Sequence, residues 1–242
     1  MIQIPNTSVD HYKDPIVAHG FHENRYGGTI GRWFMKTEQQ TYADLAALIP
    51  RIDSVLDIGT GSGKLYASIP SQRFVGLDTS LPMLKTARDL SSIRLLLAAN
   101  CIRLPIMTKS FDLVIGSRLL MHIPSWRLLI QECCRVATCG VILDFPVRPS
   151  FAALEPRIWN ISRRHDTHPV HRVFHTRDVI TSFSENGFEC AELVKGFVLP
   201  YRFHRSLNSI SASTFIERTI KRTGIGNLFG SPAYGLFIPS ER

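Results

Sequence analysis

The stretch that decides the fold is Val55-Leu56-Asp57-Ile58-Gly59-Thr60-Gly61-Ser62-Gly63-Lys64-Leu65. Apolar residues run into an acid, three glycines then alternate with small polar residues, and helix-forming residues resume afterwards. This order predicts a strand, a tight turn and the start of a helix. Glycine is needed where the backbone takes a positive φ or where a side chain would block a ligand. The spacing therefore indicates a nucleotide-like molecule lying over exposed backbone N–H groups at a helix N-terminus.

Two common phosphate-binding motifs do not match this turn. A P-loop would need glycine at Ile58 and a hydroxyl residue at Leu65 to bind magnesium, so the Gly63-Lys64 pair is a coincidence. A dinucleotide-binding turn would need glycine in place of Lys64, and the carboxylate of Asp57 would repel a pyrophosphate. The same carboxylate suits a ligand that carries an ammonium and a sulfonium.

The pattern D-x-G-x-G-x-G that begins at Asp57 resembles motif I of the class I S-adenosylmethionine-dependent methyltransferases. Nineteen residues past Gly59, Asp78 ends the apolar run 74–77, where a carboxylate can accept hydrogen bonds from both ribose hydroxyls. The stretches 104–106 (LPI), 110–117 (SFDLVIGS) and 121–124 (MHIP) are similar to the type 11, ubiquinone-biosynthesis-like branch of that family. The resemblance covers about residues 50–146.

This resemblance implies an α/β fold, a doubly wound seven-stranded mostly parallel sheet of the Rossmann-like methyltransferase type with an N-terminal and a C-terminal insert cap. From the chain length we expect one domain over residues 1–242. It comprises an arm and cap helix in 1–50, a cofactor-binding half in 51–146 and a substrate-side half in 147–242 with an insert at 199–230. The implied cofactor is S-adenosyl-L-methionine. The family pattern assigns its binding to Asp57, Gly59, Thr60, Gly61, Gly63, Asp78, Thr79, Met83, Asn100, Cys101 and Ser117.

Outside the glycine-rich turn, periodicity and helix breakers predict the remaining elements. We expect a mobile arm over residues 1–30 and a helix over 33–48, with Trp33 and Phe34 packed in the core. Further helices are expected over 79–90, with Ser80 as N-cap, over 125–136 and over 176–186. Strands are expected over 94–99, 111–117, 141–145, 188–194 and 233–238. Apolar and basic positions in 199–230 predict an amphipathic cover over the carboxyl ends of the strands.

The composition excludes little. A chain of 242 residues with 44% hydrophobic content can bury one sizeable core, and a formal charge of +8 allows an anionic partner without identifying it. The five cysteines form no C-x-x-C pair and are typical of reduced, buried thiols in a cytosolic protein. No signal peptide and no long apolar run is evident, so we expect a soluble cytoplasmic protein, with peripheral membrane contact left open.

Histidines are the candidate catalytic groups. His122 follows a predicted cofactor-binding strand closely, so it could remove a proton from the acceptor or could only cap a turn, and His19 and His22 are weaker candidates. The histidine cluster of residues 165–175 could suggest a metal, but Pro169 interrupts any helix through it and arginines precede it. We expect no metal site there.

Three functions fit these observations. The first is a methyltransferase for a small apolar or anionic metabolite, such as a quinone precursor, a lipid or a phenol. The second is a tRNA-modifying methyltransferase, and the third is a protein that binds S-adenosylmethionine without catalysis. Apolar residues alternate with the basic ones in the second half of the chain, which favours a metabolite pocket over a nucleic-acid surface. The basic residues expected at that pocket are Arg163, Arg164, Arg172, Arg202 and Arg205.

Overall fold

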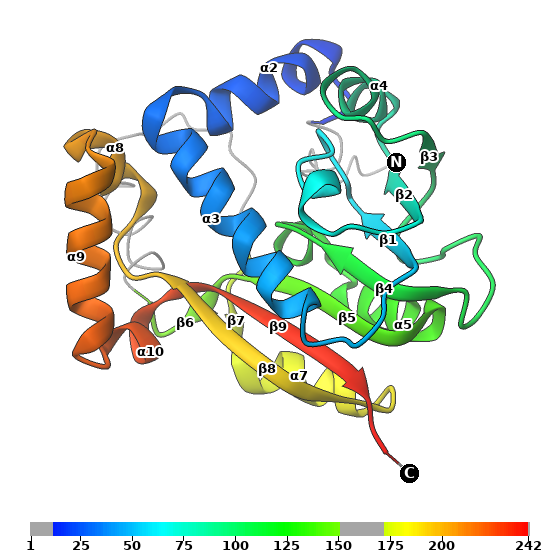
Figure 1. Ribbon diagram of the computed structural model, residues 1–242. Helices are drawn as coiled ribbons and strands as arrows, with labels where there is room; N and C mark the ends of the chain where they lie inside the picture. The colour runs from blue at the N-terminus through cyan, green and yellow to red at the C-terminus, as the bar shows by residue number, and fades with distance from the viewer. Residues whose placement is uncertain (1–11, 151–171, 242) are drawn as a thin grey trace, which may run out of the picture.

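A seven-stranded sheet forms the centre of the molecule in this computed structural model, which describes residues 12–150 and 172–241 (Figure 1). The strand order is β3-β2-β1-β4-β5-β9-β8, and all neighbours are parallel except the two pairs that involve β9. The predicted doubly wound, mostly parallel sheet is therefore confirmed. The strands are β1 Ser54–Ile58, β2 Arg73–Asp78, β3 Leu95–Ala98, β4 Phe111–Gly116, β5 Ala137–Phe145, β8 Phe188–Phe197 and β9 Ser231–Pro239.

Helices cover both faces of the sheet. Figure 1 shows α3 (Gly28–Ala46) on one face, while α5 (Trp126–Val136) and α7 (Thr176–Ser184) lie on the other. Along β4, Leu113 and Ile115 belong to the apolar cluster beside α3, whereas Val114 belongs to the cluster beside α5 and α7. This alternation follows from the two-residue period of a strand, and it explains why a central strand must be apolar on both faces.

The helix between β2 and β3 begins where the sequence predicts. In α4 (Leu81–Leu90), Ser80 Oγ accepts a hydrogen bond from the backbone N–H of Met83 at 3.2 Å, and Pro82 lies in the first turn. Ser80 is therefore the N-cap, and it fixes Met83 at the start of the helix. A separate two-stranded sheet is formed by β6 (Val147–Arg148) and β7 (Phe174–His175), which come between β5 and β8 in the sequence.

The mobile arm expected over residues 1–30 is wrong for the part that the structure describes. Residues Pro15–Tyr26 form helix α2, which is continued by α3 after Gly27. Asp14 is the N-cap, since its carboxylate accepts from the N–H of Ile16 at 2.8 Å, and proline is well tolerated at the first helical position. Pro15 is therefore a helix start, not the helix breaker that its position near the terminus suggests.

The α-helix expected directly after the glycine-rich turn is also absent. The only helical residues between β1 and β2 are the single 3-10 turn η1 (Tyr66–Ser68). The cause is local, because Gly61 and Gly63 disfavour a helix on one side and Pro70 ends it on the other. Too few residues remain between them for a stable helix.

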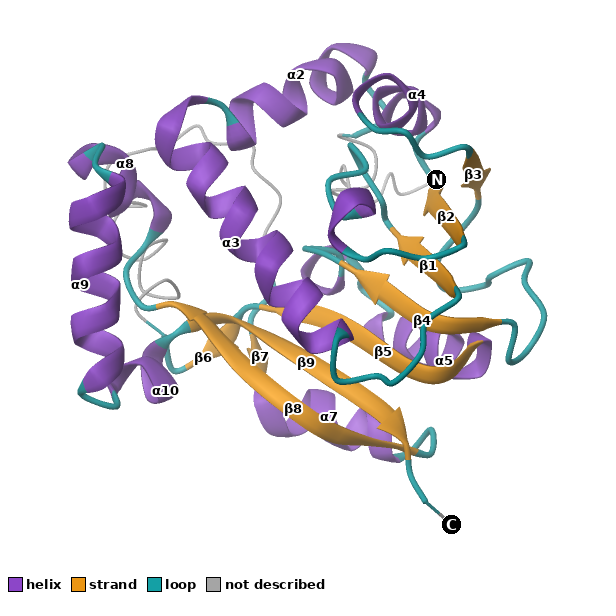
Figure 2. Ribbon diagram, in the orientation of Figure 1, coloured by secondary structure: helices purple, strands orange, loops and turns teal. Residues whose placement is uncertain are grey.

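The insert at 199–230 is helical, but it is not the expected amphipathic cover. It forms α8 (Tyr201–Leu207), α9 (Ile210–Arg222) and α10 (Ile225–Phe229), which Figure 2 shows at one end of the molecule next to α3. The buried positions of α9 are the polar Ser213 and Glu217, whereas Phe215 is 71% exposed. Glu217 binds the backbone N–H groups of residues 198 and 199 and the ring of His204, so hydrogen bonds hold this helix in place.

Trp33 and Phe34 pack in the core, as expected. Phe34 stacks on Phe197 with ring centroids 4.0 Å apart, and Trp33 contacts the same ring edge-on. Of the five cysteines, Cys139 and Cys190 are only partly buried, which corrects the prediction that all five are buried; all are free thiols. In the described part of the chain no helix is long and apolar enough to cross a membrane.

Candidate active site

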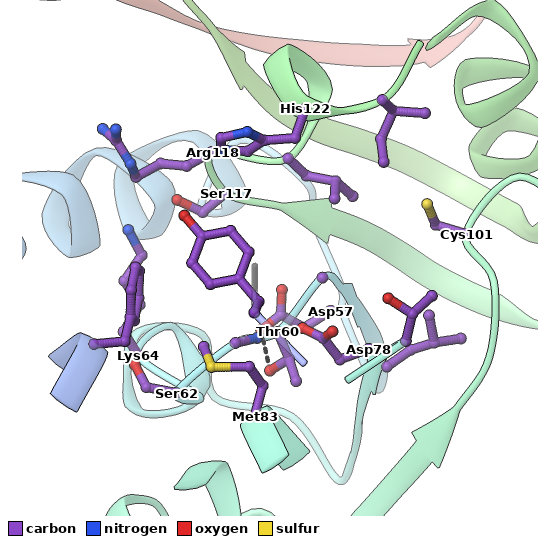
Figure 3. A pocket seen from close by; sticks show the side chains of 18 of the residues that line it. Asp57, Thr60, Ser62, Lys64, Asp78, Met83, Cys101, Ser117, Arg118 and His122 are labelled. Carbon is purple, nitrogen blue, oxygen red and sulfur yellow. Dashed lines mark hydrogen bonds between the residues drawn. The ribbon is translucent and has the colours of Figure 1, made fainter. Parts of the chain in front are cut away.

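One cavity of about 640 Å³ lies at the carboxyl ends of the central strands (Figure 3). Its walls come from the glycine-rich turn after β1, from the ends of β2, β3 and β4, and from α2. Parallel strands bring their carboxyl ends to one edge of the sheet, so residues distant in sequence meet there. About half of the residues lining the cavity are apolar or aromatic, and the others are mostly polar or charged, a mixture that suits a small molecule with both apolar and charged parts.

The cavity brings together nearly all the residues that the sequence assigned to ligand binding. Only Gly63 among them does not line it, because that glycine faces the protein, where a Cβ atom would lie 2.6 Å from Ser91 Oγ. The residues on the wall are Asp57, Gly59, Thr60, Gly61, Asp78, Thr79, Met83, Asn100, Cys101, Ser117 and His122.

The glycine-rich turn has the geometry that the sequence requires. Gly59 and Gly61 have φ angles of +64° and +55°, a region that favours glycine. A Cβ atom on Gly61 would lie 3.3 Å from the methyl group of Met83, so a larger side chain here would fill space above the turn. The N–H of Gly61 donates to Asp78 at 3.0 Å, which ties the turn to the end of β2.

Two carboxylates lie at the floor of the cavity, the buried Asp57 and the partly buried Asp78. Burial raises the pKa of Asp57 to about 7, although its carboxylate accepts a 2.7 Å hydrogen bond from Thr60. Burial also raises the pKa of Asp78, against the opposing effect of N–H donors from Ser80 and Gly61. Both acids therefore gain from a ligand that supplies cationic or hydrogen-bonding groups to their ionised forms.

The end of β3 forms a second part of the wall. Asn100 is exposed, and its side-chain oxygen accepts from the N–H of Ile102 at 3.1 Å. Burial raises the pKa of the Cys101 thiol to about 11, so this group stays protonated at neutral pH and is a poor nucleophile. At this end of the cavity, Asn100 and Cys101 can therefore contact a ligand only as neutral groups.

His122 lies on the wall opposite the glycine-rich turn, in the 3-10 turn η2 (Leu120–His122). The ring of Tyr12 meets it edge-on, with centroids 6.1 Å apart. His22 instead bonds Ser62 at 3.1 Å and does not line the cavity, and His19 is exposed. His122 is thus the one of the three proposed histidines that faces the cavity.

The sequence did not predict a buried polar network at the end of the cavity nearest to α2. Lys64 Nζ lies 2.6 Å from Glu38 Oε2 and 2.8 Å from the hydroxyl of Tyr26, and its side chain is 8% exposed. Burial raises the pKa of Glu38, but Lys64 and Arg118 outweigh that effect and leave the pKa below its ordinary value. Lys64, although no P-loop lysine, therefore joins the glycine-rich turn to α2 and α3.

Arg25 and Arg118 line the cavity and were also missed. Arg118 follows β4 with a φ of +56°, and its N–H donates to the buried carboxylate of Asp144. An arginine directly after the apolar strand β4 and a helix start at Pro15 were the two signals in the sequence that could have revealed this end of the site.

Of the five arginines expected at the pocket, the structure describes three, and none of these three lines the cavity. Arg202 and Arg205 belong to α8 and do not line the cavity, which corrects that prediction. Arg172 donates to the carbonyl of Pro124, a residue of the cavity wall. Arg163 and Arg164 lie outside the described residues, as do all but one of the clustered histidines. Across residues 12–150 and 172–241, no group of three His, Cys, Asp or Glu side chains could hold a metal ion.

Comparison with known proteins decides what this site belongs to. Residues 56–143, from β1 to β5, match the family described as a methyltransferase domain. The chain is a class I S-adenosylmethionine-dependent methyltransferase, and residues 56–143 carry the match to this family. S-adenosylmethionine is the cofactor of this methyltransferase. The cavity fits that molecule, because carboxylates on its wall have the charge opposite to the cofactor's two cationic groups and positive-φ glycines keep side chains away from the turn.

Solved structures share the fold of this methyltransferase over almost its whole length. Magnesium protoporphyrin IX methyltransferase from Synechocystis PCC 6803, with bound S-adenosylhomocysteine, is 15% identical, with a TM-score of 0.65 over 96% of this chain and 98% of that one. A putative methyltransferase in complex with the Trm112 activator from Haloferax volcanii is 18% identical, with a TM-score of 0.64 over 97% and 98%. A putative sarcosine dimethylglycine methyltransferase from Galdieria sulphuraria is 14% identical, with a TM-score of 0.61 over 96% and 99%. No curated protein sequence matches the chain.

Proposed function

We propose that this methyltransferase transfers the methyl group to a small apolar or anionic metabolite inside the cavity. The observation that carries the proposal is the way α2 covers the site: Phe21, Arg25 and Tyr26 line the cavity opposite the strand ends. An acceptor bound there lies between α2 and the sheet, in a partly apolar space. Such an enclosed space suits a small molecule better than the wet, flat surface that nucleic acid requires.

The same geometry supports a role for each cofactor residue. In our proposal Asp78 accepts hydrogen bonds from the ribose hydroxyls, since each of its oxygens accepts only one backbone N–H and keeps a second lone pair. Met83 packs against the adenine, and Asn100 and Cys101 border its edge. Gly59, Thr60, Gly61, Thr79 and Ser117 complete the contacts, Asp57 faces the cationic end, and Gly63 only shapes the turn.

The chemistry that the cofactor supplies is an electrophilic methyl group on a sulfonium. The protein's part is to hold the acceptor in line with it, to exclude water and, where the acceptor is protonated, to remove the proton. His122 faces the cavity and is our candidate for that base. A histidine suits the role because its ordinary pKa lies close to neutral pH.

The names of similar structures agree with a small acceptor. One is named for magnesium protoporphyrin IX and another for sarcosine and dimethylglycine, which differ widely in size and charge. The fold therefore accommodates acceptors of different size, and only the residues around the cavity can decide which one binds here.

The test is to follow labelled methyl from S-adenosylmethionine into cell extract that has been separated into small-molecule, lipid and RNA fractions. We expect label in the small-molecule or lipid fraction, and at least several-fold less with the Asp78→Ala variant at a cofactor concentration near the wild-type Kd. Asp89→Ala is the matched control, because Asp89 is an exposed acid on α4 outside the cavity. Label that accumulates in RNA would replace this proposal with the tRNA-modifying alternative.

A further inference from the structure

Two arginines reach the cavity from opposite sides. Arg25 is on α2, and Arg118 follows β4 directly after Ser117. Figure 3 shows Arg118 and Lys64 at the end of the cavity near Ser117, away from Asp78 and Cys101. The backbone of Arg118 is held in place by its hydrogen bond to Asp144, so the direction of this side chain is set by the fold.

Carboxylates near these arginines are already engaged. Glu38 contacts Lys64 at 2.6 Å and Arg118 at the longer distance of 3.8 Å, so one carboxylate serves two cations. Arg25 forms no ion pair within the described residues; its guanidinium lies over the ring of Tyr201, 4.9 Å from the centroid. Arginine has five N–H donors in a planar fork, and most of those on Arg25 and Arg118 remain available to a ligand.

The local charges favour the binding of an anion beside the two arginines. The pKa of Arg25 is lowered, first by the positive charge of Arg118 and then by burial, which means that the two guanidinium groups repel each other. The four cations on the cavity wall, Lys13, Arg25, Lys64 and Arg118, are balanced by Glu38, Asp57, Asp78 and Asp144 only when all four acids are ionised. Burial raises the pKa of the three aspartates.

S-adenosylmethionine as a whole does not supply this negative charge. Its sulfonium and ammonium outnumber its single carboxylate, so its binding adds positive charge to the site. A second anion near the arginines would therefore bind favourably when the cofactor is present.

We propose that Arg25 and Arg118 bind a carboxylate of the methyl acceptor, and thus that the acceptor is an organic acid. This inference rests on the proposed function and narrows it. The residues beside the two arginines suit the rest of such a molecule, because Phe21, Leu119 and Ile123 give the wall an apolar surface. A planar guanidinium pairs with a carboxylate through two parallel hydrogen bonds, which fixes the orientation as well as the position of the ligand.

The test uses two fluorinated probes that differ mainly in charge. Binding of 4-fluorobenzoate and of 4-fluorobenzamide is measured by fluorine NMR with protein saturated with S-adenosylhomocysteine. We expect the wild-type protein to prefer the carboxylate by about tenfold or more, the effect of hydrogen bonds to a charged group. Arg25→Gln and Arg118→Gln should each remove most of this preference. Arg32→Gln is the matched control, since Arg32 is exposed on α3 outside the cavity.

Affinity for S-adenosylhomocysteine, measured by calorimetry on the same variants, separates the outcomes. We expect it to change less than about threefold in Arg25→Gln, a variant that breaks no ion pair between described residues. A large loss of this affinity would mean that the arginines bind the carboxylate of the cofactor, and would overturn the proposal. Equal binding of the two probes, or no binding of 4-fluorobenzoate, would also overturn it. If the wild-type protein does not bind S-adenosylhomocysteine, the proposed function itself fails.

Discussion

Replacing Asp78 with alanine should weaken cofactor binding more than the same replacement of Asp57, the other carboxylate on the cavity wall. The carboxylate accepts from Gly61 N–H at 3.0 Å and from Ser80 N–H at 2.9 Å, so it is held rigidly and keeps one lone pair on each oxygen for a ribose hydroxyl. The alanine variant loses these acceptors. It also leaves the N–H of Gly61 without its partner at the cavity wall.

The expected loss is about 1.5 to 3 kcal/mol, the range for hydrogen bonds to a charged group, or roughly ten- to a hundredfold in affinity. Calorimetric titration with S-adenosylhomocysteine measures it, and Asp89→Ala should bind like the wild type. Asp78→Asn keeps the shape but only one acceptor oxygen, so it should lie between the two. An alanine variant that unfolds at the wild-type temperature and binds within about twofold of the wild-type affinity would refute the ribose role.

Three further changes test other parts of the site. Gly61→Val should abolish binding of S-adenosylhomocysteine, because the valine side chain fills the space above the turn. Gly187→Val, at a positive φ with open space around it, is the control for backbone strain. If Gly61→Val still binds S-adenosylhomocysteine, the turn does not face the ligand. Glu38→Gln should lower the free energy of unfolding in urea by roughly 3 to 5 kcal/mol, since it leaves Lys64 buried without its partner, whereas a loss under about 1 kcal/mol would contradict this. For Asp57, burial raises the pKa from 3.8 unfolded to about 7 folded, so its contribution to stability is full below about pH 3.8 and is lost as pH rises toward 7. Affinity for S-adenosylmethionine, relative to Asp57→Asn, should therefore rise between about pH 6 and pH 8 because the cation binds the ionised acid, and a ratio that stays constant with pH would exclude this role.

The sequence predicted the parts of the site that local patterns determine. Three glycines at a strand end require a tight turn, and an acid at the end of the next strand meets that turn because parallel strands end at one edge. Asp78 and Gly61 illustrate this, since the structure joins them by a hydrogen bond. Ser80 was predicted in the same way, because an N-cap is a contact between neighbours in sequence.

The sequence could not predict contacts that only the tertiary fold creates. Lys64 follows the glycines and was dismissed because it matches no phosphate-binding motif, yet its partner Glu38 comes from a separate helix. The basic residues of the second half of the chain suggested a pocket by composition alone. The two arginines that do face the cavity, Arg25 and Arg118, are isolated in the sequence and give no such signal.

The prediction of a mobile arm near the N-terminus was wrong for a different, local reason. Proline and glycine usually break helices, but here Asp14 and Pro15 together form a helix start, and Gly20 is tolerated inside α2. The consequence concerns function, because α2 forms the cover of the cavity. An arm would have left the acceptor site open, whereas a helix limits the size of the molecule that can enter.

The most direct test of where this methyltransferase works is its crystal structure with S-adenosylhomocysteine. We expect the ribose hydroxyls on Asp78, the adenine beside Met83, and the sulfur directed toward the space between His122 and α2, with Arg25 and Arg118 on its far side. A cofactor bound outside the cavity, or one that fills the space beneath α2 and leaves no room for an acceptor, would contradict both the site and the proposed reaction.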